Sequence, residues 1–241
     1  MIKKLLKKYA FFIFSQSWTQ EENKAFLSLI SKKNGSSLVD LGCGDGRLTL
    51  LFADKAKAEK IVGVEPGKIK RFINNKKIKV ISANLNHPLP FKDNSFDIVV
   101  SHFSLEHLYN IDVFIKESKR ILKKGGYTLV ATDNLASWPN ILALIMGWQP
   151  FTTTYGVANK SLGNPFAVGG DFEIEEGDSI GELSHNKVLA YQMLGDAYRE
   201  YGFRVKSITG VGYFPFYGAL SRLFCKIDKR HAHLLIIKAY K

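Results

Sequence analysis

Cysteine is scarce in this sequence, and the two that are present, Cys43 and Cys225, lie in unrelated contexts. They provide neither a disulfide framework nor a cysteine-based metal cluster, and we expect no bound metal. Such sparing use of cysteine is typical of a reducing compartment, so we predict a cytoplasmic protein. No apolar run approaches the length of about eighteen residues that a membrane-spanning helix requires.

Several sequence patterns are also missing, and each absence argues against a class of site. Gly42, Gly44 and Gly46 follow a G-x-G-x-G spacing, so the G-x-G-x-x-G turn of dinucleotide-binding enzymes is absent. The chain has no D-x-[DN]-x-[DN]-G calcium loop. It also lacks the D/N-P-P-[YFW] segment that marks many enzymes acting on the amino groups of nucleic-acid bases. The composition, 46% hydrophobic and 23% charged, is that of an ordinary globular protein.

The chain is basic, with 34 Lys and Arg against 22 Asp and Glu and a formal net charge of +12. Such a balance is compatible with binding nucleic acid, an anionic membrane or an acidic substrate. The lysines are spread along the chain, however, and several recur at helical spacing, as Lys116, Lys119 and Lys123 do. We therefore interpret them as a solvated surface and do not expect a nucleic-acid partner.

The first fourteen residues have the pattern of a basic amphipathic helix. Ile2, Leu5, Leu6, Tyr9, Phe12 and Ile13 share one face, and Lys3, Lys4, Lys7 and Lys8 share the other. Such a helix can lie on an anionic membrane surface, cover a ligand pocket or pack on its own domain. We favour packing and keep peripheral membrane contact through this helix as an alternative. The start also resembles a signal peptide, but no small-residue cleavage site follows.

A second helix is predicted after Thr19, because Thr19 and Glu22 have the spacing of a capping box. Its apolar stripe includes Phe26 and Ile30, and Gly35 ends it. The next segment, Leu38 to Arg47, is an apolar strand that runs into the glycine-spaced turn. Because glycine has no Cβ and tolerates positive φ, a ligand can lie against bare backbone at such a turn.

Strand and helix patterns then alternate as far as Asp133, which indicates a parallel sheet with helices on both faces. The expected strands are 60–66, with Glu65 at its tip, then 79–83, 96–101 and 127–134, with a helix through Lys124 before the last. An acidic residue at the tip of the second strand can accept both hydroxyls of a ribose. Ligands in such folds bind at the carboxyl ends of the strands.

This ordered series resembles the class I S-adenosylmethionine-dependent methyltransferases, in particular their broad small-molecule branch. The likeness rests on the glycine turn, Glu65, the link LPFKDNSFD at 89–97 and the EHL segment at 106–108. It implies an α/β fold with a Rossmann-like, doubly wound, seven-stranded sheet. That sheet would be mostly parallel with an antiparallel C-terminal strand.

The resemblance also implies which residues meet S-adenosylmethionine. Those expected to bind it are Asp40, Gly42, Gly44, Glu65, Asn84, Leu85 and Ser101. The first three and Ser101 would flank its methionine part, Glu65 would hold the ribose, and Asn84 and Leu85 would face the adenine. The family usually has Asp where this chain has Asn84, whose amide oxygen can still accept a hydrogen bond.

Residues 134–187 interrupt the alternation and are predicted to form an inserted lid or substrate element. Trp138 to Phe151 is dense in apolar residues, and Pro139 suits a first helical turn. Such a helix could roof an active site or simply pack on the domain. The acidic stretch 171–182 could attract a cationic acceptor or a metal ion, but we interpret it as a solvated loop.

The pattern returns from residue 188 with a helix and two closing strands, 204–208 and 234–238. An aromatic segment, 213–218, lies between these strands and could line the pocket. We therefore predict one domain over 1–241. It consists of an N-terminal helical cover (1–36), a cofactor-binding core (37–133), the inserted lid (134–187) and a closing unit (188–241).

We predict an enzyme that moves a methyl group from S-adenosylmethionine to a small or lipid-like acceptor by in-line displacement, leaving S-adenosylhomocysteine. Positioning supplies much of such a rate, and a general base helps where the nucleophile is protonated. His102, His107 and His185 are the candidate bases. The alternatives are a nucleic-acid methyltransferase, a dinucleotide-dependent oxidoreductase and a cofactor-binding protein without activity.

Overall fold

The computed structural model of the protein describes residues 21–66, 76–153, 163–166 and 185–241. Its strands are β1 (Ser36–Leu41), β2 (Ala58–Glu65), β3 (Ile78–Ser82), β4 (Phe96–His102), β5 (Leu122–Asp133), β6 (Arg204–Val211) and β7 (Leu234–Tyr240). Its helices are α2 (Arg47–Ala56), α3 (Ile111–Ile121), α4 (Trp138–Ile145), α6 (Tyr191–Glu200) and α7 (Gly218–Ile227), with short 3₁₀ turns η1 (Leu105–His107), η2 (Phe151–Thr153) and η3 (Lys229–His231). Residues 21–29 are also helical. The helix predicted over 1–14 and the acidic stretch 171–182 lie outside the described residues.

The seven strands form one sheet in the order β3-β2-β1-β4-β5-β7-β6. The first five strands pair in parallel. The last strand, β7, is antiparallel to both of its neighbours, β5 and β6. The predicted Rossmann-like, doubly wound fold with an antiparallel C-terminal strand is therefore confirmed. Because the strand order reverses between β1 and β4, a ligand crevice is expected at the carboxyl ends of these two strands.

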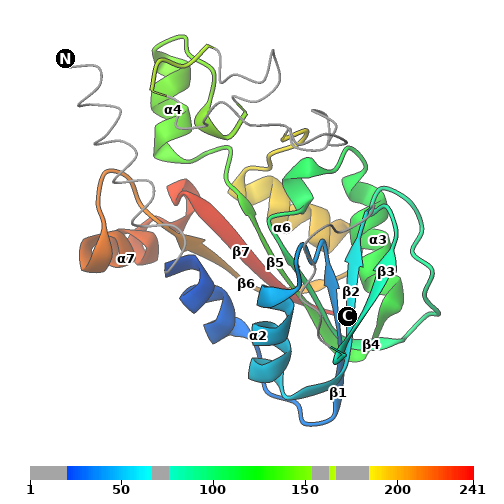
Figure 1. Ribbon diagram of the computed structural model, residues 1–241. Helices are drawn as coiled ribbons and strands as arrows, with labels where there is room; N and C mark the ends of the chain where they lie inside the picture. The colour runs from blue at the N-terminus through cyan, green and yellow to red at the C-terminus, as the bar shows by residue number, and fades with distance from the viewer. Residues whose placement is uncertain (1–20, 67–75, 154–162, 167–184) are drawn as a thin grey trace.

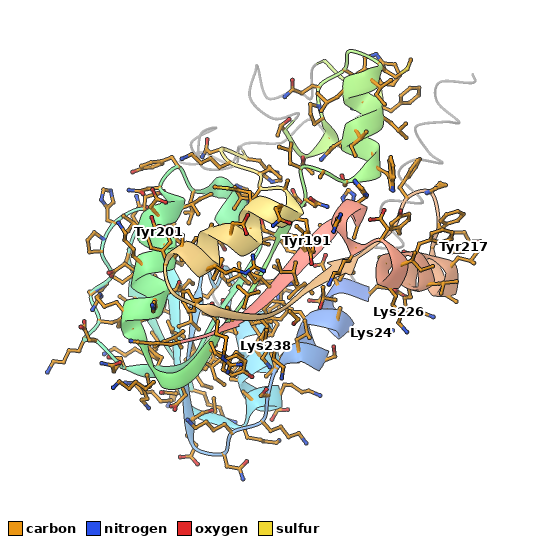
Figure 2. The ribbon with its side chains drawn as sticks, turned by 180° about the vertical axis from the view of Figure 1, so that it is seen from behind. Lys24, Tyr191, Tyr201, Tyr217, Lys226 and Lys238 are labelled. Atoms are coloured by element: carbon orange, nitrogen blue, oxygen red, sulfur yellow. The ribbon has the colours of Figure 1, made fainter. Side chains whose placement is uncertain are left out.

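Helices cover both faces of the sheet (Figure 1). On one face, the helical residues 21–29 and α2 enclose a core that includes Phe26 and Phe52. On the other, α3 and α6 enclose a core that includes Phe114 and Tyr198. Figure 2 shows α6 lying across the sheet, with Tyr191 and Tyr201 at its two ends. Each strand thus buries apolar side chains on both of its faces, as a parallel central sheet requires.

Lys238 fixes the first described helix to the sheet. It lies on β7, between β5 and the edge strand β6 (Figure 2), and only 4% of its surface is exposed. Its Nζ donates to the Leu29 carbonyl at 2.5 Å and to the Ser31 hydroxyl at 2.7 Å. It also lies 4.4 Å from the centre of the Tyr127 ring. These contacts satisfy a buried ammonium group and set the position of the helix that carries Glu22.

The helix predicted to continue through Lys124 is wrong at its C-terminal end. Helix α3 stops at Ile121, and Leu122 already belongs to β5, where it pairs with Phe96. Tertiary contacts explain the change, because Lys123 donates to the buried Asp97 carboxylate at 2.7 Å. A charged group inside the sheet is stabilised by such a partner, and helix propensity at positions 122–124 is overridden.

Helix α4 begins with Trp138, and Pro139 lies in its first turn as predicted. It lies beyond the carboxyl ends of the parallel strands, at the top of Figure 1. Within residues 21–66, 76–153, 163–166 and 185–241, every helix falls short of the length and apolar character needed to span a bilayer.

Candidate functional site

The turn between β1 and α2 is built around three glycines with positive φ, Gly42 at 84°, Gly44 at 51° and Gly46 at 84°. At Gly42 a Cβ would lie 1.9 Å from the Ser104 hydroxyl oxygen, so only glycine fits there. At Gly44 a Cβ would meet no atom within 4 Å among the described residues. The chain therefore presents bare backbone to open space at Gly44, as a ligand-binding turn should.

Asp40 lies fully buried at the end of β1, directly below this turn. Its Oδ2 accepts a hydrogen bond of 2.6 Å from the Thr49 hydroxyl. Its Oδ1 is also buried, and in the part of the chain that the structure describes nothing donates to it. Burial, and in part the charge of Glu65, raises the pKa of Asp40 to about 7, although the Thr49 hydrogen bond opposes this. A buried acceptor without a donor is costly and suits a bound ligand that supplies one.

Glu65 ends β2 beside the same turn. Its Oε2 accepts a hydrogen bond of 2.8 Å from the Gly44 backbone N–H. Burial raises the pKa of Glu65, and the Gly44 hydrogen bond partly offsets the rise. The carboxylate is thus aimed by the backbone of the glycine turn, at the position where a ribose would meet it. These features, with the orphaned oxygen of Asp40, fit S-adenosylmethionine, and the roles of Asp40, Gly42, Gly44 and Glu65 stay predictions.

Asn84 and Leu85 follow β3 and differ in exposure. Leu85 is buried, and its side chain lies 3.9 Å from the position that a Cβ on Gly42 would take. Asn84 is exposed, and its amide oxygen accepts from both the backbone and the side-chain N–H of Asn86. An adenine amino group would therefore compete with Asn86 for this oxygen, so the adenine role of Asn84 stays a prediction.

Ser101, also predicted to meet the methionine part, is fully buried in β4. Its hydroxyl donates to the Leu41 carbonyl at 2.8 Å. This hydrogen bond joins the carboxyl ends of β1 and β4, the two strands between which the sheet order reverses. Ser101 thus holds the crevice together, and direct contact with a ligand stays a prediction.

His102, at the end of β4, is one of the three predicted candidate bases. It packs against Phe26, with ring centres 5.0 Å apart, and its Nε2 lies 3.6 Å from a carboxylate oxygen of Glu22. Burial lowers the pKa of His102 to about 4. The capping-box acid, Glu22, is therefore buried against His102. Burial, and then the charge of Asp133, raises the pKa of Glu22 to about 8.

The other two candidate bases lie next to each other. The rings of His107 and His185 are 4.9 Å apart, although one follows β4 and the other lies near the end of the insertion. Glu106 is buried beside them, and one donor atom from each of these three residues lies within 4.8 Å of the others. His185 Nδ1 lies 3.0 Å from Asp133 Oδ2 and 2.8 Å from the Thr152 carbonyl oxygen.

Burial and neighbouring charges shift the pKa values of Glu106 and His185. Burial, and then the charge of Asp133, raises the pKa of Glu106. Burial lowers the pKa of His185, but its hydrogen bond to Asp133 and the charges of Asp133 and Glu106 reverse this and raise it. The raised pKa of His185 means that the acidic groups beside it stabilise a positive charge at this position.

Helix α4 joins this edge through polar contacts. Asn140 Nδ2 donates to the Asn134 carbonyl at 3.0 Å and to the Thr152 hydroxyl at 2.8 Å. Trp138 Nε1 donates to the Tyr213 hydroxyl at 2.7 Å, so the predicted aromatic segment 213–218 does contact the insertion. Leu142 and Ile145 on the helix are exposed. Helix α4 thus contacts this edge through Asn140 and exposes apolar side chains elsewhere on its surface.

Sequence reasoning missed the Glu22–His102 and Asp133–His185 pairs. Neither pair has a spacing signal, because its members are far apart in the chain and meet only through the sheet. The grouping of Glu106, His107 and His185 was also not anticipated, because His185 lies near the end of the insertion, far from the other two in the chain. The expectation of no bound metal stays a prediction. Glu106 and His107 were visible in the EHL segment, and Asp133 was visible as the acidic end of a strand.

Comparisons with known proteins agree with this geometry. Residues 39–130 match the family model described as a methyltransferase domain. The chain is 30% identical over 136 residues to an uncharacterized methyltransferase of Schizosaccharomyces pombe, covering 51% of this chain and 49% of that protein. It is 31% identical over 126 residues to a ubiquinone biosynthesis O-methyltransferase of Pelagibacter ubique, covering 48% and 52%. The chain thus spans about half the length of these two relatives.

Among solved structures, the chain is similar to an S-adenosylmethionine-dependent methyltransferase of Thermotoga maritima. The TM-score is 0.59 at 19% identity, covering 100% of this chain and 98% of that one. A likeness at this identity shows the fold. It agrees with the sheet order found for this chain.

Proposed function

The chain carries a class I S-adenosylmethionine-dependent methyltransferase domain, and from this premise we propose that it methylates a small or lipid-like acceptor. The observation that carries the proposal is the open backbone at Gly44, between the Glu65 carboxylate and the orphaned Asp40 oxygen. When bound, S-adenosylmethionine supplies a methyl carbon activated by a sulfonium. Asp40, Gly42, Gly44 and Glu65 would hold it, with Leu85 against the adenine.

The chain's own residues would act mainly by position and charge. Backbone at Gly44 admits the ligand closely, and Glu65 accepts hydrogen bonds from the ribose hydroxyls. The buried carboxyl group of Asp40 favours a positively charged ligand, because a nearby cation stabilises its ionised form. Holding donor and acceptor in line can supply about 7–11 kcal/mol of the barrier.

The acceptor would lie between the inserted segment and the carboxyl ends of β4 and β5. Apolar residues of α4 support an apolar body for this molecule, since ligand sites are mostly apolar with a few polar groups. The name of the Pelagibacter ubique relative, which refers to ubiquinone biosynthesis, supports a lipid-like acceptor with an oxygen nucleophile. Acidic groups at this edge oppose a nucleic-acid phosphate, which favours a small-molecule acceptor.

Among the candidate bases, His102 is the weakest. It is packed between Phe26 and Phe103 and has a pKa lowered to about 4, so it holds a proton poorly near neutral pH. His107 and His185 lie where the acceptor's polar end is expected.

The first experiment is a thermal shift with S-adenosylmethionine, S-adenosylhomocysteine and NAD. At about a hundred times Kd, a ligand that binds only the folded state adds about 2.7 kcal/mol. For a chain of this length, the melting temperature should rise by roughly 5–10 °C with both adenosyl ligands and not with NAD. Glu65→Ala should abolish the rise. Glu59→Ala, an exposed position on the same strand, should keep it.

Activity is then tested by following S-adenosylhomocysteine formation with hydroxylated quinone precursors and with biogenic amines as acceptors. Turnover with the quinone precursors alone supports the lipid-like oxygen acceptor. Turnover with amines alone would reject it. Absence of a thermal shift with either adenosyl ligand would reject the proposed function altogether.

A further inference from the structure

We propose that Glu106, His107 and His185 bind one divalent transition-metal cation. One donor atom from each of these residues lies within 4.8 Å of the other two. Two imidazoles and one carboxylate form a donor set that transition metals favour, whereas Mg²⁺ and Ca²⁺ prefer oxygen ligands. Glu106 and His107 come from η1 and His185 from near the end of the insertion, so the fold assembles this set.

The surroundings of His185 match those of a metal-binding histidine. Its Nδ1 lies 3.0 Å from the Asp133 carboxylate and 2.8 Å from the Thr152 carbonyl oxygen. Histidines that bind metals commonly donate one ring N–H to a carboxylate or carbonyl, which fixes the tautomer and raises the basicity of the other nitrogen. Asp133 and Thr152 are in place to do this for His185.

Hydrogen bonds also fix the position of Glu106. It is 1% exposed, and one of its carboxylate oxygens accepts a hydrogen bond of 2.9 Å from the Thr132 hydroxyl. Its backbone carbonyl accepts from the N–H groups of Asn186 and Lys187, which holds the chain next to His185 against η1. A buried carboxylate needs a compensating partner, and a cation shared with two histidines would supply one.

The distances allow binding after small side-chain movements. Zn²⁺ binds nitrogen and oxygen ligands at about 2.0–2.2 Å, which places tetrahedral donors about 3.4 Å apart. Side-chain rotations that move each donor atom by about 1 Å would bring the three donors of Glu106, His107 and His185 to this separation. Three protein ligands leave a fourth position open, which is the arrangement of catalytic rather than structural zinc sites.

The role of this cation rests on the proposed function. With an acceptor oxygen in the open position, it would lower the pKa of that hydroxyl, and the proton would pass to solvent. The oxygen–carbon bond then forms as the sulfur–methyl bond breaks, and S-adenosylhomocysteine leaves as a neutral thioether. The acceptor class implied is a phenol or enol with an apolar body.

The test is direct titration of the metal-stripped full chain with Zn²⁺ by calorimetry and with Co²⁺ by visible absorption. We expect one equivalent to bind, and the Co²⁺ complex should show d–d bands without a thiolate charge-transfer band. Glu106→Gln, His107→Gln and His185→Gln should each weaken binding more than tenfold. Asp133→Asn, which removes the carboxylate beside His185 but none of the three proposed ligands, should weaken binding about 10–100-fold.

His87→Gln is the matched control, because His87 is exposed and lies outside the cluster. Each variant is first checked for a native far-UV spectrum and for the S-adenosylmethionine thermal shift. No metal binding, or equal binding by the Glu106→Gln and His107→Gln variants and the unaltered chain, would reject the metal site. An intact thermal shift in that case would leave the proposed function standing.

Discussion

Glu22 has a different environment in the structure from the one that its sequence pattern predicts. Its spacing from Thr19 predicts a helix cap, yet it lies buried, with one carboxylate oxygen 3.6 Å from His102 Nε2. Burial, and then the charge of Asp133, raises its pKa from 4.5 to about 8. The folded chain therefore keeps a proton on Glu22 that the unfolded chain releases above pH 4.5.

This shift predicts a pH dependence of stability. The contribution of Glu22 is fully present below pH 4.5 and is lost as the pH rises through about 8. Glu22→Gln, which mimics the protonated acid, should therefore gain stability relative to the unaltered chain, by up to about 1.4 kcal/mol per pH unit between pH 5 and pH 8. Urea unfolding followed by circular dichroism at these pH values measures the difference.

The control is Glu21→Gln. Glu21 is the neighbour of Glu22 on the same helix, and it forms a partly exposed ion pair with Arg222 of α7. Its stability relative to the unaltered chain should stay nearly constant over this pH range. Parallel stability curves for Glu22→Gln and the unaltered chain would show that Glu22 is ionised in the fold.

At the scale of elements, the strands are predicted best. The apolar runs place every strand in its observed position to within a few residues, except that β5 begins at Leu122 instead of 127 and includes Gly125. The end of α3 is missed because Lys123 turns inward to Asp97, a contact between residues that are distant in the chain. The cluster around His185 could not be predicted from local pattern either, because its members are also distant in the chain. Local pattern thus predicts the elements, and the side-chain partners across the sheet require the three-dimensional fold.

The β1–α2 turn gives the element-scale prediction. Gly44→Ala should cost about 1 kcal/mol of stability, because alanine is strained at a φ of 51°. It should also weaken S-adenosylmethionine binding more than tenfold, because the added methyl group enters the open space at the turn. Urea unfolding and ligand titration of the same variant separate the two effects.

Gly125→Ala is the matched control for this experiment. Gly125 has a φ of 75° and likewise has open space where the methyl group of alanine would lie, but it is at the opposite end of β5 from the site. It should lose similar stability and keep its affinity for S-adenosylmethionine. Equal affinity of Gly44→Ala and Gly125→Ala would place the ligand away from the glycine turn.

At the scale of the whole molecule, the insertion is tied to the rest of the fold on several sides. Asn134 Nδ2 donates to the carbonyls of Arg230 and Ala232, and the Leu135 N–H donates to the Leu189 carbonyl. Trp138 reaches Tyr213, whose hydroxyl donates to Asp228 at 2.6 Å. Because these bonds join 134–153 to the segments that flank β6 and β7 in the closing unit, we propose that the insertion and the sheet form one folding unit.

One cooperative transition is therefore expected in urea. In a Trp18→Phe background, the remaining tryptophans, Trp138 and Trp148, report on the insertion, whereas far-UV circular dichroism reports on the whole fold. The two curves should coincide. Phe114→Ala opens the core on the α3 face, far from both tryptophans in sequence. It should lower the free energy of unfolding by about 3–5 kcal/mol, and by the same amount whichever signal is followed. A fluorescence transition that precedes the loss of circular dichroism would instead make the insertion a separate unit, because its contacts would then break while the sheet remains folded.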